Sequence, residues 1–188
     1  MITLNPDTLF GKGLHRECFI HPDDKNKCIK VVTNGNQQET EREQGYYRLL
    51  EKNKISWDML PRFYGNIDTD MGSGAVFELI RDSNGQVSKT LEYYLADTTF
   101  VASHREQIHQ ALAELKTYLL RYNIITMPIK SKNVLFRFNE NNQGRLYIID
   151  NIGNANLITI ESHWPFLGRK KIIRRWDRFI KTLTTLKD

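Results

Sequence analysis

Two stretches within the first 80 residues alternate apolar and polar positions with the two-residue period of β-strands. Gly11 and Gly13 form a glycine break, and polar or glycine-containing turns separate the apolar stretches that follow. The pattern predicts two hairpins, each made of two short strands around such a turn. The predicted strands are Glu17–His21, Lys27–Thr33, Phe63–Thr69 and Ala75–Ile80.

Other segments of the chain show the apolar spacing of helices, with a small hairpin between the two clearest ones. Helices are predicted over residues 37–53, Thr90–Ala96, 104–122 and 169–186, and the hairpin strands are Val134–Phe138 and Leu146–Ile149. The last helix has one apolar face, formed by Ile172, Trp176, Phe179, Ile180, Leu183 and Leu186.

This order of elements predicts an α+β fold with two lobes. A small β-rich lobe would span about residues 1–80, and a shortened helical lobe about residues 81–188. At 188 residues we expect a single domain, which is long enough to bury a real core.

Composition narrows the class of protein. Hydrophobic residues make up 40% and aromatic residues 11%, which is too apolar for a disordered chain. No apolar run approaches the ~18 residues of a membrane-spanning helix, and Met1–Asp7 lacks the features of a secretory signal. Cys18 and Cys28 are too few for a disulfide framework. We therefore expect a cytoplasmic protein with reduced cysteines and no membrane partner.

Positive charge is concentrated at the C-terminal end. The formal net charge is +5, whereas residues 168–188, with eight basic and two acidic side chains, carry +6 on their own. The rest of the chain is nearly neutral, so the overall charge does not indicate nucleic-acid binding. Two interpretations of the last helix stay open. Either its basic side is only solvated while its apolar face packs in the core, or that side binds a nucleic acid or another anionic surface.

Residues suited to phosphate chemistry occur in the first quarter of the chain. Gly11 and Gly13 would let the backbone approach a phosphate, and Lys30 lies inside an apolar strand. Glu43 is the acidic residue of its helix that we expect to face inward and to pair with Lys30. Each has an ordinary alternative: a tight turn, a lysine facing water on an edge strand, and a solvated acidic helix face.

Further candidates lie at loop ends in the second half. Asn133 could bind a metal through its amide oxygen, and Lys130 could reach a phosphate. Asp150 follows an apolar strand and precedes Gly153, a suitable setting for a Mg²⁺ ligand. The alternatives are a plain helix-to-strand loop and a turn-forming aspartate.

Taken in order, these residues resemble the protein-kinase-like fold. Its motifs run from a glycine-rich loop through a strand lysine and a helix glutamate to a catalytic-loop asparagine and an Asp-Phe-Gly tripeptide. A closer resemblance, over nearly the whole chain, is to the YrbL family of bacterial PhoP regulatory network proteins. The segments that carry it are Gly11-x-Gly13-x-His15-Arg16-x-Cys18, Cys28-Ile29-Lys30-Val31-Val32, Thr126-Met127-x-Ile129-Lys130-x-x-Asn133 and Asp150-Asn151-Ile152-Gly153.

The kinase resemblance implies that ATP and Mg²⁺ bind between the two lobes. The implied nucleotide-binding residues are Gly11, Gly13, Lys30 and Glu43, the implied metal ligands are Asn133 and Asp150, and the candidate catalytic residue is Lys130.

The chain departs from kinases where catalysis would occur. The kinase catalytic aspartate lies five positions before the asparagine, and that position is Pro128. No Asp or Glu lies between Ile124 and Asn139, and loss of a general base typically costs ~10²–10⁴ in rate. The 35 residues after Gly153 leave no room for a full activation segment and a helical platform for protein substrates.

Three functions remain open. We favour a regulatory module that binds Mg-ATP with weak or no phosphotransfer and is recognised by a protein partner, because Pro128 removes the general base. The second is an atypical phosphotransferase that works through Lys130 and metal positioning. The third is binding of a nucleic acid or another anionic surface by the basic C-terminal helix, although nucleic acid is not the partner we expect.

Overall fold

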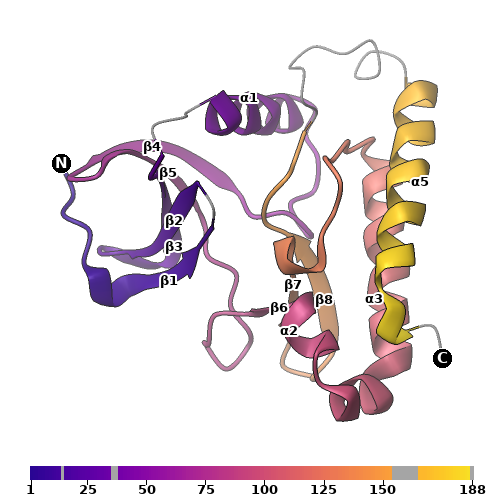
Figure 1. The fold of residues 1–188 in the computed structure, drawn as a ribbon. Helices are drawn as coiled ribbons and strands as arrows, with labels where there is room; N and C mark the ends of the chain where they lie inside the picture. The colour runs from indigo at the N-terminus through magenta and orange to yellow at the C-terminus, as the bar shows by residue number, and fades with distance from the viewer. Residues whose placement is uncertain (14, 35–37, 154–164, 187–188) are drawn as a thin grey trace.

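The computed structural model describes residues 1–13, 15–34, 38–153 and 165–186, which form a mixed α+β fold with two antiparallel sheets (Figure 1). The first sheet has five strands in the order β1-β2-β3-β5-β4. These strands are β1 (Leu9–Lys12), β2 (Arg16–His21), β3 (Asp24–Val32), β4 (Phe63–Thr69) and β5 (Gly72–Glu78).

Residues 28–31 of strand β3 are buried on both faces, although one of those faces carries a lysine. Ile29 and Val31 face a small apolar cluster that includes Phe19, and both are fully buried. Cys28 and Lys30 point to the opposite side, because side chains alternate along a strand. Cys28 belongs to the main core, so Lys30 also lies on the side that faces the rest of the protein.

Helix α1 (Gln38–Lys52) connects β3 to β4 and is fixed to two other parts of the chain. The amides of Gln44 and Asn66 exchange hydrogen bonds of 2.8 and 3.1 Å, which hold α1 against β4. The buried hydroxyl of Tyr46 accepts a hydrogen bond of 2.8 Å from the backbone N–H of Ile125. These contacts set the direction in which the side chains of α1 point.

The second sheet and the remaining helices follow β5. Figure 1 shows α5 lying alongside α3, on the far side of the second sheet from β1–β5. The strands are β6 (Lys89–Thr90), β7 (Val134–Phe138) and β8 (Gly144–Ile148), and the helices are α2 (Leu91–Leu95), α3 (Thr98–Arg121) and α5 (Pro165–Thr182). Short 3-10 turns occur at η1 (Pro6–Thr8), η2 (Ser131–Asn133) and η3 (Thr184–Leu186).

The main core is continuous from the first sheet through α1 to α3 and α5. The apolar face of α5 is buried in it, and the indole of Trp176 is only 4% exposed, so the predicted packing of this face in the core is confirmed. Within the part of the chain that the structure describes, no helix has the length and apolar character needed to cross a membrane.

Several boundaries differ from the prediction. Helix α3 begins at Thr98 rather than residue 104, because the Asp97 carboxylate caps it by accepting hydrogen bonds from the backbone N–H groups of Thr99 and Phe100. The segment from Gly72 belongs to β5, although it was predicted as a turn. Strand β6 was not predicted, since two residues carry no periodicity.

Some of the predicted features lie in residues that the structure does not describe. The described residues do not include residues 35 and 36, in the polar turn expected after the strand Lys27–Thr33, or residue 37 of the first predicted helix. They also do not include the segment 154–164.

Candidate functional site

Four charged side chains from four separate segments meet where the first sheet faces the end of β8. Arg16 comes from β2, Lys30 from β3, Glu43 from α1, and Asp150 lies two residues beyond β8. The guanidinium of Arg16 donates from Nη1 to Oε2 of Glu43 and from Nη2 to Oδ1 of Asp150, each at 2.5 Å. Lys30 Nζ donates to the carbonyl oxygen of Ile149 at 2.7 Å. We call Arg16, Lys30, Glu43 and Asp150 the charged cluster.

The register of the first sheet places both cations on one face. Cys18 pairs with Lys30 across β2 and β3, and Arg16 is two residues before Cys18. Directly opposed residues share a face, as do residues two apart, so Arg16 and Lys30 both project toward α1. The ammonium of Lys30 lies 4.4 Å from the centre of the Phe77 ring, which shields it from water.

The segment after β8 is held in place by backbone hydrogen bonds. The N–H of Met127 donates to the carbonyl of Asn151 at 2.7 Å, and the N–H of Gly153 donates to the carbonyl of Ile125 at 2.9 Å. The two C-terminal motifs, 126–133 and 150–153, therefore lie side by side, and this pairing fixes the position of Asp150.

The cluster is electrically balanced. Burial alone would lower the pKa of Lys30, but the carboxylates of Glu43 and Asp150 outweigh it and raise that pKa above the ordinary value. Burial alone would raise the pKa of Asp150, and the charges of Lys30 and Arg16 hold it below the ordinary value instead. The two cations and two carboxylates give the charged cluster a formal net charge of zero.

Two buried polar atoms beside the cluster lack a hydrogen-bond partner in the described residues, namely Oε1 of Glu43 and the hydroxyl oxygen of Tyr47. Burial first, and then the nearby carboxylates of Glu43 and Asp150, raise the pKa of Tyr47. A buried polar atom without a partner costs ~1–3 kcal/mol. The cluster thus has hydrogen-bonding capacity that these residues leave unfilled.

Three of the residues singled out from the sequence are brought together here: Lys30, Glu43 and Asp150. The expected direct pair between Lys30 and Glu43 is not formed within 4.0 Å in the described structure, and Glu43 pairs with Arg16 instead. Arg16 lies inside a motif of the family resemblance, but no role was predicted for it. Alternation along the strand puts Arg16 and Cys18 on one face, and only the register of β2 against β3 shows that this face also carries Lys30.

Gly11 and Gly13 lie on the hairpin that carries Arg16. Gly11 is opposite Cys18, and the N–H of Gly13 donates to the carbonyl of Arg16 at 2.8 Å. Neither glycine has a positive φ, and an added Cβ at either would meet its nearest neighbour at 3.4 Å. This hairpin therefore does not need glycine for its own backbone conformation.

Lys130 and Asn133 lie at the two ends of the η2 region. Lys130 is exposed, and its side chain makes no hydrogen bond or ion pair with the described residues. Asn133 is half-buried, and its carbonyl accepts a hydrogen bond of 3.0 Å from the N–H of Ile149. Asn133 is thus a close backbone neighbour of Asp150, whereas Lys130 is not part of the cluster.

As arranged, this donor set does not fit Mg²⁺. Magnesium requires near-octahedral oxygen coordination, usually with one or two carboxylates. Oδ1 of Asp150 already accepts hydrogen bonds from Arg16 and from the N–H of Asn151, and the guanidinium is a positive charge in contact with that carboxylate. The described residues contain no group of three or more His, Cys, Asp and Glu side chains placed to hold a metal.

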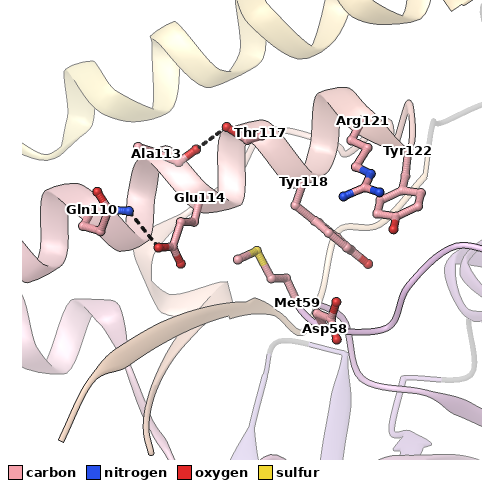
Figure 2. Close-up of a pocket in the computed structure, with 9 residues that line it drawn as sticks. All are labelled: Asp58, Met59, Gln110, Ala113, Glu114, Thr117, Tyr118, Arg121 and Tyr122. Carbon is pink, nitrogen blue, oxygen red and sulfur yellow. Dashed lines mark hydrogen bonds between the residues drawn. The ribbon is translucent and has the colours of Figure 1, made fainter. Parts of the chain in front are cut away.

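A surface hollow of about 310 Å³ lies away from the cluster, between α3 and the segment 58–59 (Figure 2). Gln110 donates to the carboxylate of Glu114 at 2.8 Å, and the hydroxyl of Thr117 donates to the carbonyl of Ala113 at 2.9 Å. These polar groups are engaged along the helix itself rather than converging on the hollow, so we place the candidate site at the charged cluster.

Comparison with known proteins identifies the family. Residues 2–184 match the family model described as PhoP regulatory network protein YrbL. A protein of Escherichia coli (strain K12) named "Uncharacterized protein YrbL" is 34% identical over 183 residues, which cover 96% of this chain and 87% of that protein. A protein of Shigella flexneri with the same name shows the same identity and coverage. The chain therefore belongs to the YrbL family of PhoP regulatory network proteins.

Proposed function

We propose that the charged cluster is the base of a nucleotide-binding site in a kinase-like regulatory protein with weak or no phosphotransfer. The observation that carries the proposal is the convergence of buried Lys30 and Glu43 with half-buried Asp150 in one place, although the three residues are far apart in the sequence. These are the strand lysine, helix glutamate and strand-end aspartate that the kinase resemblance selects.

The order of elements also supports this proposal. A five-stranded sheet carries Lys30 on β3, the helix with Glu43 follows directly, and Asp150 lies just after the β7–β8 hairpin. Buried ion pairs add little net stability relative to apolar packing, because both charges lose their hydration. A role in ligand binding gives a reason for placing four charges between two sheets.

The geometry favours binding over phosphotransfer. The proposed site has no carboxylate at position 128, and Pro128 itself is exposed on the loop before η2. Nucleotide binding would join the first sheet to the segment that carries Asp150, and a regulatory protein partner would recognise the resulting shape. The alternative, a phosphotransferase acting through Lys130, requires that exposed side chain to reach a bound phosphate.

The proposal is tested by nucleotide-induced changes in melting temperature. A nucleotide at 100 times its dissociation constant stabilises a protein by ~2.7 kcal/mol, which corresponds to roughly 5–10 °C for a chain of this size. We expect this shift for ATP or another purine nucleotide at millimolar concentration. No shift with any adenine or guanine nucleotide would refute the proposed site.

Variants assign the shift to the cluster. Lys30→Met and Asp150→Asn should each reduce the nucleotide-induced shift, measured against the melting temperature of the same variant without nucleotide. Lys25→Gln is the matched control, because Lys25 is an exposed lysine on the same strand and should leave the shift unchanged.

The basic side of α5 supports a second candidate function, binding of an anionic surface. Most of its basic side chains are exposed while the opposite face packs in the core, so positive charge is concentrated along one side of the helix. The exposed members are Arg169, Lys170, Arg174, Arg178 and Lys181. Such a row favours weak, sequence-independent attraction to polyanions.

A further inference from the structure

The guanidinium of Arg16 is in contact with Asp150, one of the two residues that the kinase resemblance implies as metal ligands. It contacts the carboxylate of Glu43 at the same time. We propose that Arg16 is the resident cation of this site and that the site binds a nucleoside phosphate without a divalent metal. This inference rests on the proposed nucleotide-binding function and specifies the form of the ligand.

Charge balance is the first argument. Glu43 and Asp150 bring two negative charges, and Arg16 and Lys30 bring two positive charges. With the cations already supplied by the chain, the site has no excess negative charge to attract Mg²⁺. A divalent ion at Asp150 would also lie next to the guanidinium and be repelled by it, since both are positive.

The geometry of the guanidinium is the second argument. An arginine has five N–H donors in a fixed planar arrangement, and the two bonds to Glu43 and Asp150 use only two of them. The side chain keeps 15% of its surface exposed, so the group is anchored but not sealed. A guanidinium stays protonated and its planar fork matches phosphate oxygens, so an anchored one is a preformed phosphate contact.

The anchoring also explains how Arg16 is held without a metal. Glu43 is fixed through α1, where neighbouring Gln44 bonds to Asn66, and Asp150 is fixed by the pairing of residues 125–127 with 151–153. Arg16 therefore bridges two rigid parts of the protein. A phosphate bound to it would contact both parts through one side chain.

The first experiment titrates Mn²⁺ alone and detects it by electron paramagnetic resonance. The wild-type protein should bind no Mn²⁺ at the cluster, whereas Arg16→Gln should gain one site, because it releases the carboxylates of Glu43 and Asp150. Lys12→Gln is the matched control, since it removes a positive charge from the same hairpin at a side chain that is 73% exposed. Arg16→Gln/Asp150→Asn should lose the gained site, which assigns that site to the cluster.

The second experiment compares ATP binding in EDTA and in Mg²⁺. We expect the wild-type dissociation constants in the two buffers to agree within about twofold, and Arg16→Gln to weaken binding in EDTA by about tenfold or more, the effect of losing a charge-assisted phosphate contact. Arg16→Lys should bind ATP more weakly than wild type as well, because a lysine ammonium lacks the planar arrangement of N–H donors that matches carboxylate and phosphate oxygens.

The outcomes separate the two proposals. Wild-type binding of ATP in Mg²⁺ but not in EDTA, or a wild-type Mn²⁺ site as tight as that of Arg16→Gln, would overturn the inference while leaving nucleotide binding intact. Failure of ATP to bind in both buffers would overturn the proposed function, and this inference with it. Arg16→Gln leaves the buried carboxylate of Glu43 unpaired. If the variant does not fold for that reason, Arg16→Gln/Glu43→Gln removes the unpaired negative charge. This double variant still frees Asp150, so a Mn²⁺ affinity no higher than wild type would count against the inference.

Discussion

Gly153 lies three residues after Asp150, and its replacement should be costly. Its φ of +94° lies in the region that favours glycine, and an added Cβ would lie 3.1 Å from both Cβ and Cγ of Tyr46. Tyr46 cannot easily move away, because its ring is buried and its hydroxyl is held by the N–H of Ile125. The substitution Gly153→Ala therefore combines backbone strain with overpacking.

The magnitude follows from these two contributions. A left-handed conformation costs a non-glycine residue ~1–2 kcal/mol, and inserting a methyl group into a packed site costs ~1–3 kcal/mol. Gly153→Ala should thus lower the free energy of unfolding by ~2–5 kcal/mol. Gly85 is a matched control, since its φ is +82° and an added Cβ there would meet nothing within 4 Å. Gly85→Ala should show only the backbone cost.

Urea unfolding monitored by tryptophan fluorescence would measure both variants. Gly153→Ala should lose clearly more stability than Gly85→Ala. Gly153→Ala should also weaken nucleotide binding, because strain at residue 153 is transmitted to Asp150 through the paired backbone. Equal losses in the two variants would show that Tyr46 yields to the added methyl group and that the packing argument is wrong.

Four further predictions concern catalysis, the last helix and pH. Because Pro128 replaces a general base, purified protein should hydrolyse ATP and autophosphorylate far more slowly than the ~1–100 s⁻¹ of kinases, and turnover in that range would refute the binding-module proposal. Trp176→Ala should lower the free energy of unfolding, measured in urea, by ~3–5 kcal/mol because the indole is buried, whereas Arg174→Gln on the exposed side should change it little. Similar losses in the two variants would contradict the placement of α5. Duplex DNA should bind weakly to the basic side of α5, and its binding constant should fall by roughly 0.9 log units per log unit of salt for each phosphate neutralised. Tight, sequence-selective binding at ~200 mM salt would instead make nucleic-acid recognition the leading function. The pKa of Asp150 lies below its ordinary value of 3.8, so its carboxylate stabilises the fold above pH 3.8, and this contribution is lost as the pH falls through the folded-state pKa. The difference in unfolding free energy between wild type and Asp150→Asn should therefore persist near neutral pH and disappear in acid. A difference that does not depend on pH would contradict this prediction.

Local pattern alone predicted most of the secondary structure. Strands β4 and β7 have the predicted bounds, Phe63–Thr69 and Val134–Phe138, because alternation and flanking turns act within a few residues. The apolar face of α5 was equally clear, since a helix buries residues spaced by three and four positions. The start of α3 was missed because the cap at Asp97 lies in a stretch whose apolar spacing is weak.

The family and the residues Lys30, Glu43 and Asp150 were also accessible from the sequence, since motifs preserve their order along the chain. The sequence did not show which side chains these three residues would contact. Whether Glu43 meets Lys30 or Arg16 depends on the register of β2 against β3 and on the way α1 is fixed by Gln44.

Tertiary structure alone decided the role of Arg16. Its two carboxylate partners lie 27 and 134 residues away, and no local pattern encodes contacts at such separations. A charge is placed between two others only when the sheets, helix and loop that carry them have packed together. Sequence periodicity determines which face of each element is apolar, whereas packing determines which charges meet where those faces join.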